Sequence, residues 1–308
     1  MKLPEDFDPV HGEVVSLGPM LRRIVAPNPS PMTWRGTNTY LVGASRLAVI
    51  DPGPDNDAHL QAILAATDGG RSISHILVTH AHLDHSPLAR QLSKLSRAPV
   101  LAFGPAEAGR SAVMTRLAAS GLAGGGEGID AGFQPDTRLT HGATVDGDGW
   151  TLRALHTPGH IGNHICLAWE DVCFTGDHVM GWASSLVSPP DGDLTDFMTS
   201  CATLQKEDWR TFYPGHGKPV TNPQERLKWL ISHRQARESA ILDALDAGPA
   251  TAADIARRIY TDVPAELLGA ATRNVLAHLI DLHEKKVVCS VGDLSETASF
   301  LLREKAGS

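Results

Sequence analysis

The sequence lacks the features that would attach the chain to a membrane or export it. No uninterrupted apolar run in the 308 residues approaches the roughly 18 residues that a membrane-spanning helix needs. Residues 1–13 contain four acidic side chains, one lysine and no apolar stretch, a composition unlike a secretory signal or an arginine-rich transit peptide. We therefore expect a cytoplasmic protein with no membrane partner.

Cysteine and positive charge are also scarce. The four cysteines, Cys166, Cys173, Cys201 and Cys289, form no C-x-x-C pattern, so we interpret them as small buried residues without disulfides. The formal net charge is −8, and residues 226–308 contain 11 basic and 11 acidic side chains. Binding that depends on neutralising phosphates requires a positive excess, so the charge disfavours a nucleic-acid-binding protein.

The sequence does contain enough apolar residues to form a sizeable core. Apolar residues make up 42% and charged residues 20% of the chain, as in ordinary globular enzymes. A length of 308 residues exceeds that of a typical single domain. We therefore expect two folded units.

Short apolar runs alternate with segments of helical spacing from Val14 to about Pro219. The runs predict strands at Tyr40–Val42, Leu47–Ile50, Ile73–Thr79, Pro99–Leu101, Thr151–His156, His164–Trp169, Val172–Thr175 and Thr211–Tyr213. Helices are predicted at Asp57–Thr67, Pro87–Leu95, Pro105–Ala119 and Leu194–Lys206. This order favours an α+β fold with two mixed sheets covered by helices over a single doubly wound sheet.

The pattern changes after residue 223. Helical spacing predicts helices at Gln224–Leu245, Ala252–Tyr260 and Ala265–Lys285, and a hairpin is predicted from Val287–Val291 and Ala298–Leu302. Three helices and a hairpin indicate a winged-helix-like module. We expect an N-terminal domain of residues 1–223 and a winged-helix-like domain of residues 224–308.

The strongest chemical signal is the segment Thr79-His80-Ala81-His82-Leu83-Asp84-His85. It follows an apolar strand and precedes a helix. Histidines two residues apart on an extended segment point the same way, so His80 and His82 can share one metal ion. Asp84 and His85, turned by the start of the helix, can serve a second ion beside it.

Three further candidates also lie just beyond predicted strands. His160 ends His156-Thr157-Pro158-Gly159-His160, Asp177 ends Phe174-Thr175-Gly176-Asp177, and His216 lies in Tyr213-Pro214-Gly215-His216-Gly217. A Pro-Gly turn followed by histidine is usually ordinary turn chemistry, so each signal is weak by itself. Their order behind the first segment makes them one set.

These motifs together resemble the metallo-β-lactamase superfamily, whose fold is an αββα sandwich with a two-metal site on one edge. Residues 36–42 and 50–53 extend the resemblance upstream. The resemblance implies two zinc ions per chain. It assigns one ion to His80, His82 and His160, the other to Asp84, His85 and His216, and a bridging role to Asp177. It places Asp51 beside the site without making it a ligand.

Departures from relatives narrow the implied activity. The true β-lactamases of this superfamily lack a bridging aspartate at the position of Asp177, which disfavours β-lactam hydrolysis. Flavodiiron relatives have glutamate where this chain has His82, and an imidazole-rich site favours zinc over iron. Where many relatives continue with Ser-Gly-Gly, His85 is followed by Ser86-Pro87-Leu88, which alters the helix start but no ligand.

The region from Trp229 to Arg234 and the winged-helix-like tail resemble the β-lactamase-like protein 2 branch. That branch includes single-strand endoribonucleases and thioesterases that release acyl chains from carrier proteins. The resemblance therefore implies a binuclear zinc-dependent hydrolase that uses a metal-bridging hydroxide. Asp84 is the catalytic candidate, because it could also help to transfer a proton to the leaving group.

The residues expected around the site favour an ester or thioester substrate. The segment His178–Asp193 contains no lysine or arginine to hold flanking phosphates, and Met32, Trp34, Met180 and Trp182 predict an apolar rim that suits an acyl group. Phosphodiester cleavage in single-stranded RNA is the alternative. A non-catalytic nucleic-acid-binding protein is a third hypothesis, which the intact set of metal-ligand residues disfavours.

Overall fold

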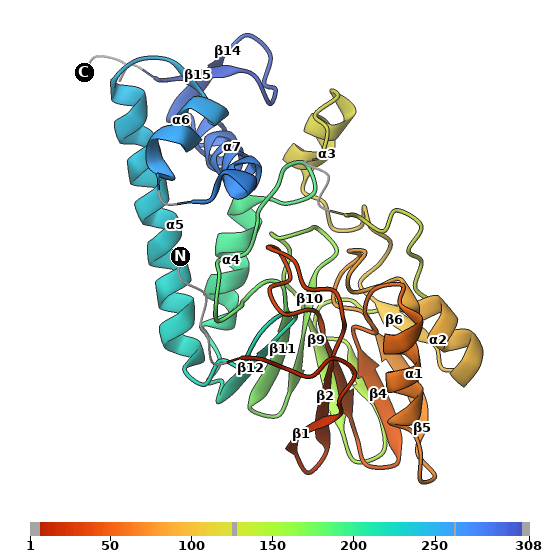
Figure 1. Ribbon diagram of the computed structural model, residues 1–308. Coiled ribbons are helices and arrows are strands. Elements are labelled where there is room, and N and C mark those ends of the chain that lie inside the picture. Colours follow the sequence, from red (N-terminus) through yellow and green to blue (C-terminus); the bar gives the residue numbers. More distant parts are fainter. Residues whose placement is uncertain (1–6, 125–127, 262, 304–308) are drawn as a thin grey trace.

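The computed structural model describes residues 7–124, 128–261 and 263–303. Two sheets pack face to face between two layers of helices, and a smaller module follows at the C-terminal end (Figure 1). Helices α1 (Asp57–Ala65) and α2 (Leu88–Ser96) cover one sheet, and α4 (Leu194–Leu204) and α5 (Pro223–Asp246) cover the other. The predicted αββα sandwich is confirmed. Among the described helices, none is long and apolar enough to cross a membrane.

The first sheet follows the chain order in its described strands. It consists of β1 (Val15–Gly18), β2 (Leu21–Val25), β3 (Asn38–Val42), β4 (Arg46–Ile50), β5 (Ser72–Leu77), β6 (Val100–Ala102) and β7 (Thr137–Arg138). Strands β1 to β4 pair antiparallel, whereas β4 to β7 pair parallel. Parallel neighbours need crossover connections, and α1 and α2 lie in two of them.

The second sheet determines where the site forms. Its order is β12 (Thr211–Pro214), β11 (Val172–Gly176), β10 (Ile165–Trp169), β9 (Thr151–His156) and β8 (Thr144–Asp146). Strand β10 is antiparallel to both β9 and β11, and β12 is parallel to β11. Strands β9, β11 and β12 therefore run in one direction, so their C-terminal ends meet at one edge.

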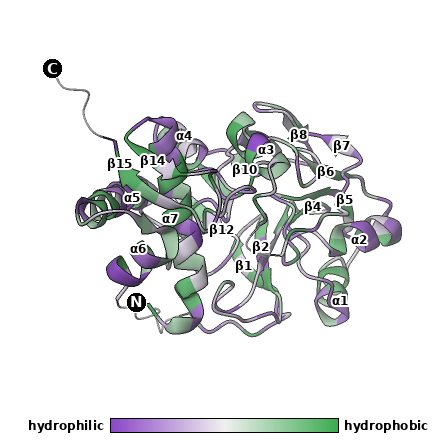
Figure 2. Cartoon of the chain, turned by 90° about the horizontal axis from the view of Figure 1, so that it is seen from above, coloured by the Kyte–Doolittle hydropathy of each residue, from purple (hydrophilic) through white to green (hydrophobic). Residues whose placement is uncertain are grey.

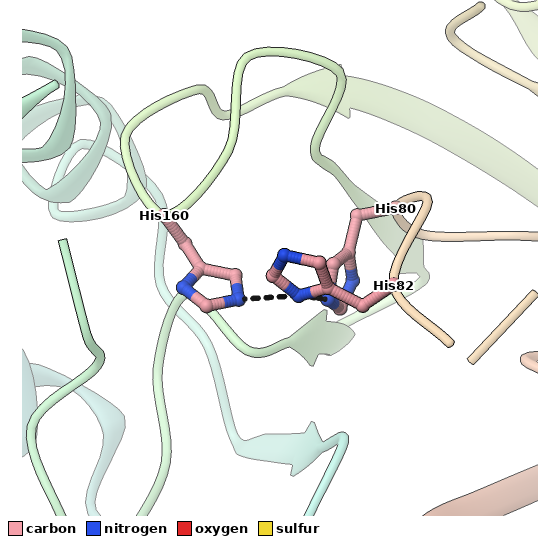
Figure 3. Close-up of side chains that lie close together, drawn as sticks. All are labelled: His80, His82 and His160. Atoms are coloured by element: carbon pink, nitrogen blue, oxygen red, sulfur yellow. Dashed lines mark hydrogen bonds between the residues drawn. The ribbon is translucent and has the colours of Figure 1, made fainter. Parts of the chain in front are cut away.

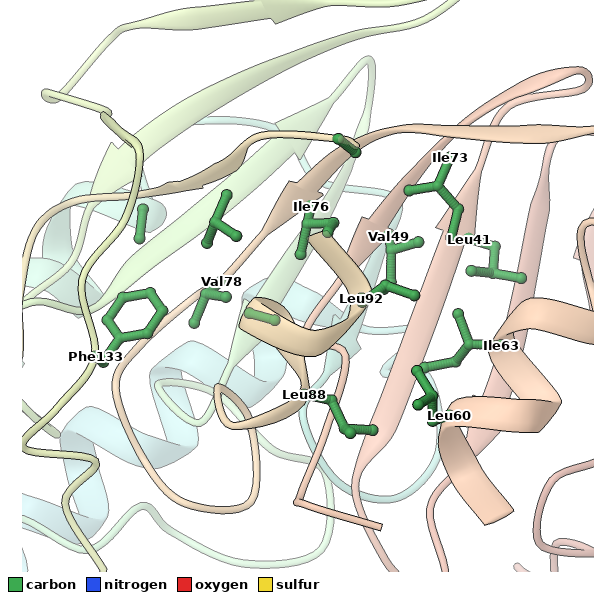
Figure 4. Close-up of a cluster of buried hydrophobic side chains, with 14 of the residues drawn as sticks. Leu41, Val49, Leu60, Ile63, Ile73, Ile76, Val78, Leu88, Leu92 and Phe133 are labelled. Atoms are coloured by element: carbon green, nitrogen blue, oxygen red, sulfur yellow. The ribbon is translucent and has the colours of Figure 1, made fainter. Parts of the chain in front are cut away.

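Successive strand residues face different layers because side chains alternate along a strand. Leu41 and Val49 belong to the cluster beneath α1 and α2 (Figure 4), while Tyr40 and Ile50 pack between the two sheets. Each fully buried aliphatic side chain of this kind contributes about 1.5–3 kcal/mol to folding. The same alternation places Cys166 against the α4 and α5 layer.

Helix α2 shows how a helix covers a sheet. Leu88 and Leu92 are buried against the first sheet, whereas Arg90 and Lys94 are exposed, the one-sided pattern of a helix that packs along one stripe. Figure 2 shows hydrophilic residues on the outward side of α2. The beginning of this helix is the part of the chain that follows His85.

The C-terminal module has its own apolar core. It contains β13 (Ala250–Thr251), α6 (Ala252–Ile259), a 3₁₀ turn (Ala265–Leu267), α7 (Leu268–Glu284), β14 (Val288–Val291) and β15 (Ser299–Leu302). The core includes Ile255, Leu276 and Phe300. The side chains of Thr251 and Asp254 form a capping box at the start of α6. The predicted winged-helix-like arrangement of helices and hairpin is confirmed.

Some predicted bounds were wrong. Helix α3 covers only Ala112–Ala119 rather than Pro105–Ala119, because the side chain of Ser111 caps it by accepting a hydrogen bond from the Met114 amide at 3.1 Å. Strand β5 ends at Leu77 rather than Thr79. The amide of Thr79 instead donates to Oδ1 of Asp51 at 2.7 Å. Strands β1 and β2 lie in a segment where the sequence had predicted no strand.

Candidate metal centre

The structure brings all seven candidate ligands to one edge of the sandwich. The first four lie between β5 and α2, and the others follow β9, β11 and β12 directly or within a few residues. Their ligand atoms form two groups, each with all atoms within 4.8 Å of one another. We call them the three-histidine cluster, made of His80, His82 and His160, and the carboxylate cluster, made of Asp84, His85, Asp177 and His216.

In the three-histidine cluster the ring nitrogens converge on one point. Nε2 of His80 and Nε2 of His160 each lie 3.0 Å from Nδ1 of His82 (Figure 3). Burial lowers the pKa of His80 well below its usual value, and burial together with the charge of His160 lowers the pKa of His82 to about 3. At neutral pH these two imidazoles are therefore uncharged and offer lone pairs, as metal ligands must.

Hydrogen bonds behind this cluster determine which nitrogen of His80 faces inward. The hydroxyl of Thr79 donates to Oδ2 of Asp51 at 2.8 Å, so its oxygen is left to accept from Nδ1 of His80 at 2.9 Å. His80 therefore carries its proton on Nδ1 and presents Nε2 as a lone pair. Nδ1 of His160 likewise donates to the Leu186 carbonyl at 2.7 Å.

The carboxylate cluster places two imidazoles between two carboxylates. Nε2 of His216 lies 3.1 Å from Oδ2 of Asp84 and 3.3 Å from Oδ2 of Asp177. Nε2 of His85 lies 3.3 Å from Oδ2 of Asp84 and 3.4 Å from Oδ1 of Asp177. Nδ1 of His85 faces Oδ2 of Asp51 at 3.0 Å, so Asp51 supports both clusters without belonging to either.

Asp177 lies between the two clusters. Its Oδ2 is 3.3 Å from Nε2 of His216 and 3.8 Å from Nε2 of His160. The backbone beside it leaves no room for a side chain at Gly215, where an added Cβ would lie 2.3 Å from Oδ1 of Asp177 and 2.7 Å from Cε1 of His85. Glycine is therefore required next to His216.

The charges of the carboxylate cluster shift its pKa values in the opposite direction to those of the other cluster. Burial opposes protonation of His216, but Asp177 and Asp84 outweigh it and raise the pKa of His216 to about 10. The same carboxylates and Asp51 raise the pKa of His85 well above its usual value against the effect of burial. Burial would raise the pKa values of Asp84 and Asp177, but the two histidines hold them well below the usual range.

The donor set fits two metal ions. Among the described residues, Nε2 of His85 and Oδ1 of Asp177 are buried atoms without a hydrogen-bond partner, and both point into the carboxylate cluster. A cation there would satisfy both. Five imidazoles and two carboxylates at this spacing suit zinc-class ions.

Sequence comparison agrees with this geometry. Residues 32–216 match the family described as the metallo-beta-lactamase superfamily, and residues 251–296 match the beta-lactamase associated winged helix domain. This chain belongs to the metallo-β-lactamase superfamily. It is a metal-dependent hydrolase of that superfamily with an associated winged-helix domain.

Relatives of known name cover most of the chain. A beta-lactamase-like protein 2 homolog of Drosophila melanogaster is 31% identical over 274 residues, which are 85% of this chain and 87% of the relative. An atrochrysone carboxyl ACP thioesterase of Aspergillus fumigatus is 34% identical over 278 residues, covering 83% of this chain and 78% of the relative. The predicted resemblance to the β-lactamase-like protein 2 branch is confirmed.

Solved structures share the fold over nearly the whole length. A metallo-beta-lactamase family protein from Thermus thermophilus superposes with a TM-score of 0.74 at 27% identity, covering 94% of this chain and all of that chain. A beta-lactamase domain protein from Burkholderia ambifaria gives a TM-score of 0.79 at 22% identity over 98% of this chain and 97% of its own, which shows the shared fold.

Two further histidines lie near this superfamily centre without joining either cluster. Nδ1 of His164 is 2.9 Å from the Thr157 hydroxyl, and Nε2 of His178 is 3.5 Å from Sγ of Cys201. Both rings are fully buried, and burial lowers the pKa of His178 to about 3. They pack beside the centre as neutral side chains.

A pocket of about 450 Å³ is lined in part by residues 218–222, which follow His216 in the chain, and by none of the seven candidate ligands. Its wall includes Trp34, Trp182 and Trp229, together with Lys218 and Arg226. The first two indoles pack on Gly217, because a Cβ there would lie 2.8 Å from Cδ1 of Trp182 and 3.0 Å from Cζ3 of Trp34. Two walls of the pocket therefore contact the residue next to His216, and the lining itself resumes at Lys218.

The predicted apolar rim needs correction at Met32 and Met180, since neither lines this pocket. Met180 is only 5% exposed and does not line this pocket, because it lies beneath Arg226, whose Nε donates to its carbonyl at 2.7 Å. The sequence did not indicate Trp229, Lys218 or Arg226 as pocket residues. A stacked pair could have suggested Trp229, since His233 follows it by one helical turn and its ring centroid lies 4.8 Å away.

Proposed function

We propose that this chain is a binuclear zinc hydrolase that cleaves an ester or thioester. The tryptophan-lined pocket carries this proposal, because aromatic walls suit an apolar acyl group and two of its tryptophans, Trp34 and Trp182, pack on Gly217, the chain neighbour of His216. The thioesterase name of the Aspergillus fumigatus relative supports it. We further propose that the protein is cytoplasmic and that its catalytic domain comprises residues 1–223, with the winged-helix-like domain comprising residues 224–308.

In this proposal the three-histidine cluster holds one zinc ion and Asp84, His85 and His216 hold the other, with Asp177 serving both. When bound, the ions supply a water nucleophile at neutral pH and polarise the carbonyl oxygen. The chain's own residues orient the imidazoles through Asp51 and Thr79 and exclude water through the buried walls of the centre.

Asp84 has a second role in the proposal. Its side chain is 25% exposed, more than those of His85, Asp177 and His216, with which it shares the carboxylate cluster. Its Oδ2 accepts a hydrogen bond from the Thr37 hydroxyl at 3.3 Å. A carboxylate that faces both the cluster and solvent can relay a proton, so we propose that Asp84 accepts the proton lost by the attacking water and passes it to the leaving group.

Single-strand endoribonuclease activity is the alternative, and one observation favours it. Lys218 and Arg226 lie in the same wall as the tryptophans, and cations beside aromatic rings are typical of single-strand nucleic-acid sites. Arg226 is already bound to backbone, since Nε and Nη2 donate to the carbonyls of Met180 and Ala183 at 2.7 and 2.6 Å. The role of Arg226 in the wall is therefore structural. This observation favours acyl hydrolysis over RNA cleavage.

One preparation distinguishes the two reactions. Zinc-loaded protein is assayed with acyl thioesters of increasing chain length and with a labelled single-stranded RNA, at low and high salt. We expect thioester hydrolysis that improves with chain length and changes little with salt. Efficient RNA cleavage that Asp177→Ala abolishes and that weakens steeply with salt would replace this proposal with the endoribonuclease.

A further inference from the structure

The segment of residues 185–188 connects the metal centre with the C-terminal module. It lies between Asp177 and α4, and all four of its residues are buried. Buried backbone groups need hydrogen-bond partners inside the protein. In this segment the partners come from the metal centre on one side and from α5 and α7 on the other.

On the side of the metal centre, the segment holds His160. The Leu186 carbonyl accepts from Nδ1 of His160 at 2.7 Å, which leaves Nε2 facing His82. The hydroxyl of Ser185 bonds with the carbonyl of Asp177 and lies 3.0 Å from that of His178. The position of residues 185–186 therefore determines how His160 is turned and where the Asp177 backbone lies.

On the other side, two side chains of the C-terminal helices hold the groups that flank Leu186. Nη2 of Arg234, on α5, donates to the Ser185 carbonyl. Oδ1 of Asn274, on α7, accepts from the Val187 amide at 3.1 Å and from Nη1 of Arg234 at 2.9 Å. The two side chains thus form one bonded unit that fixes both peptide groups of Leu186, including the one that contains the Leu186 carbonyl.

The surroundings of Arg234 give no reason to expect that this buried arginine stabilises the fold. Its side chain is 2% exposed, and among the described residues it has no salt-bridge partner and its Nε has no hydrogen-bond partner. Its charge meets the Phe197 ring at 5.0 Å and neutral oxygens. A buried cation without a counter-charge costs stability, and an apolar side chain of similar size would avoid that cost.

We propose that Arg234 and Asn274 are positioning residues for His160, acting through the Leu186 carbonyl. The inference rests on the proposed function, since it treats His160 as a metal ligand. Groups that orient a ligating histidine typically change metal affinity by about 10- to 100-fold when they are removed. The C-terminal module is then a part of the metal centre, although it contributes no ligand.

The test compares Asn274→Leu with Asn274→Asp. Leucine removes the acceptor for Val187 and Arg234, whereas aspartate keeps an oxygen in the same place. For Asn274→Leu we expect zinc affinity at one of two sites to fall by about 10- to 100-fold, with kcat lowered more than KM. We expect Asn274→Asp to remain close to wild type.

A second readout needs neither zinc nor activity. The ¹⁵N shifts of the His160 ring in the metal-free protein report which nitrogen carries the proton. We expect wild type and Asn274→Asp to show the Nδ1-protonated form and Asn274→Leu to show a mixture. Arg234→Met, which keeps the stem over Phe197, gives a second variant should Asn274→Leu fail to fold, with the same expected mixture.

The matched control is Phe300→Leu, which alters the core of the same module away from residues 185–188. We expect it to lower the melting temperature while leaving zinc affinity and the His160 shifts unchanged. Folded Asn274→Leu and Arg234→Met with wild-type zinc affinity and wild-type shifts would overturn the inference. Failure of wild-type His160 to respond to zinc would instead overturn the proposed function.

Discussion

The three-histidine cluster and the carboxylate cluster lie side by side at one sheet edge, yet their electrostatics are opposite. Burial lowers the pKa values of His80 and His82, while Asp84 and Asp177 raise those of His85 and His216. Without metal, His80 and His82 are therefore neutral at neutral pH, whereas His85 and His216 hold protons. In the carboxylate cluster, protons on His85 and His216 therefore supply the positive charge that a metal ion would supply. Metal binding must displace these protons, whereas His80 and His82 have none to displace.

Asp177 is the residue whose loss should affect both halves. Because its carboxylate lies between the clusters, Asp177→Ala should lower zinc occupancy at both and reduce kcat/KM by on the order of a thousandfold or more. Metal analysis together with thioester kinetics checks this. Asp171→Ala is the control, since that carboxylate pairs with Arg210 at 2.7 Å on the surface. Loss of one ion with full activity would refute the bridging role.

Replacing Thr79 should weaken zinc binding at the two clusters to different extents. Thr79→Val removes the acceptor for Nδ1 of His80, so we expect about 10- to 100-fold weaker zinc binding at the three-histidine cluster and a smaller effect at the other. Competition with a chelator measures both affinities. Thr199→Val, which loses only a bond to a helix carbonyl at 2.9 Å, serves as control. Equal weakening at both clusters would contradict the role of Thr79 as a support of His80 in particular.

The tryptophan-lined pocket has one wall, Trp182, that packs on the residue next to His216, and replacing this tryptophan tests whether the pocket holds the acyl chain. Trp182→Ala should raise KM for long acyl thioesters by about tenfold while metal content stays unchanged. An acetyl thioester is the internal control, because it is too short to fill the pocket. An equal rise of KM for short and long substrates would show that the pocket does not select the acyl chain.

The stability of the metal-free protein should depend on pH through His216. The folded state keeps the His216 proton up to a pKa of about 10, whereas an unfolded histidine releases its proton near its ordinary value of about 6.5. Stability is therefore fully present below about pH 6.5 and declines as pH rises towards 10. We expect the melting temperature to fall by at least about 3 °C over this range. Zinc-loaded protein, whose His216 has no proton to lose, should change less.

Candidate ligands were easier to find in the sequence than the groups that hydrogen-bond to them and hold them in place. Histidines two apart at a strand end are a local pattern, so His80 and His82 were identifiable without the fold, whereas Asp177 became a candidate only through its order behind them. The Leu186 carbonyl was not, because a backbone oxygen has no sequence signature. Arg234 and Asn274 reach it from helices far along the chain, and only the packing of α5 and α7 brings them there.

In the fold, too, features set by the local sequence were predictable, and features set by contacts between distant residues were not. Strands β9 (Thr151–His156) and β11 (Val172–Gly176) were predictable within a residue because their apolar runs are long and alternate between two cores. The start of α3 was not, since the N-cap at Ser111 begins the helix seven residues later than the predicted start at Pro105. Met180 looked like a rim residue by composition but lies under Arg226.

The most direct test of two unequal metal sites is to count the protons released as zinc binds. Metal-free protein at pH 7 is titrated calorimetrically with zinc in buffers of different ionisation enthalpy. We predict two bound ions, with no proton released by His80 or His82 and about two protons released at the carboxylate cluster, from His85 and His216. A single bound ion, or equal proton release for both ions, would contradict the account.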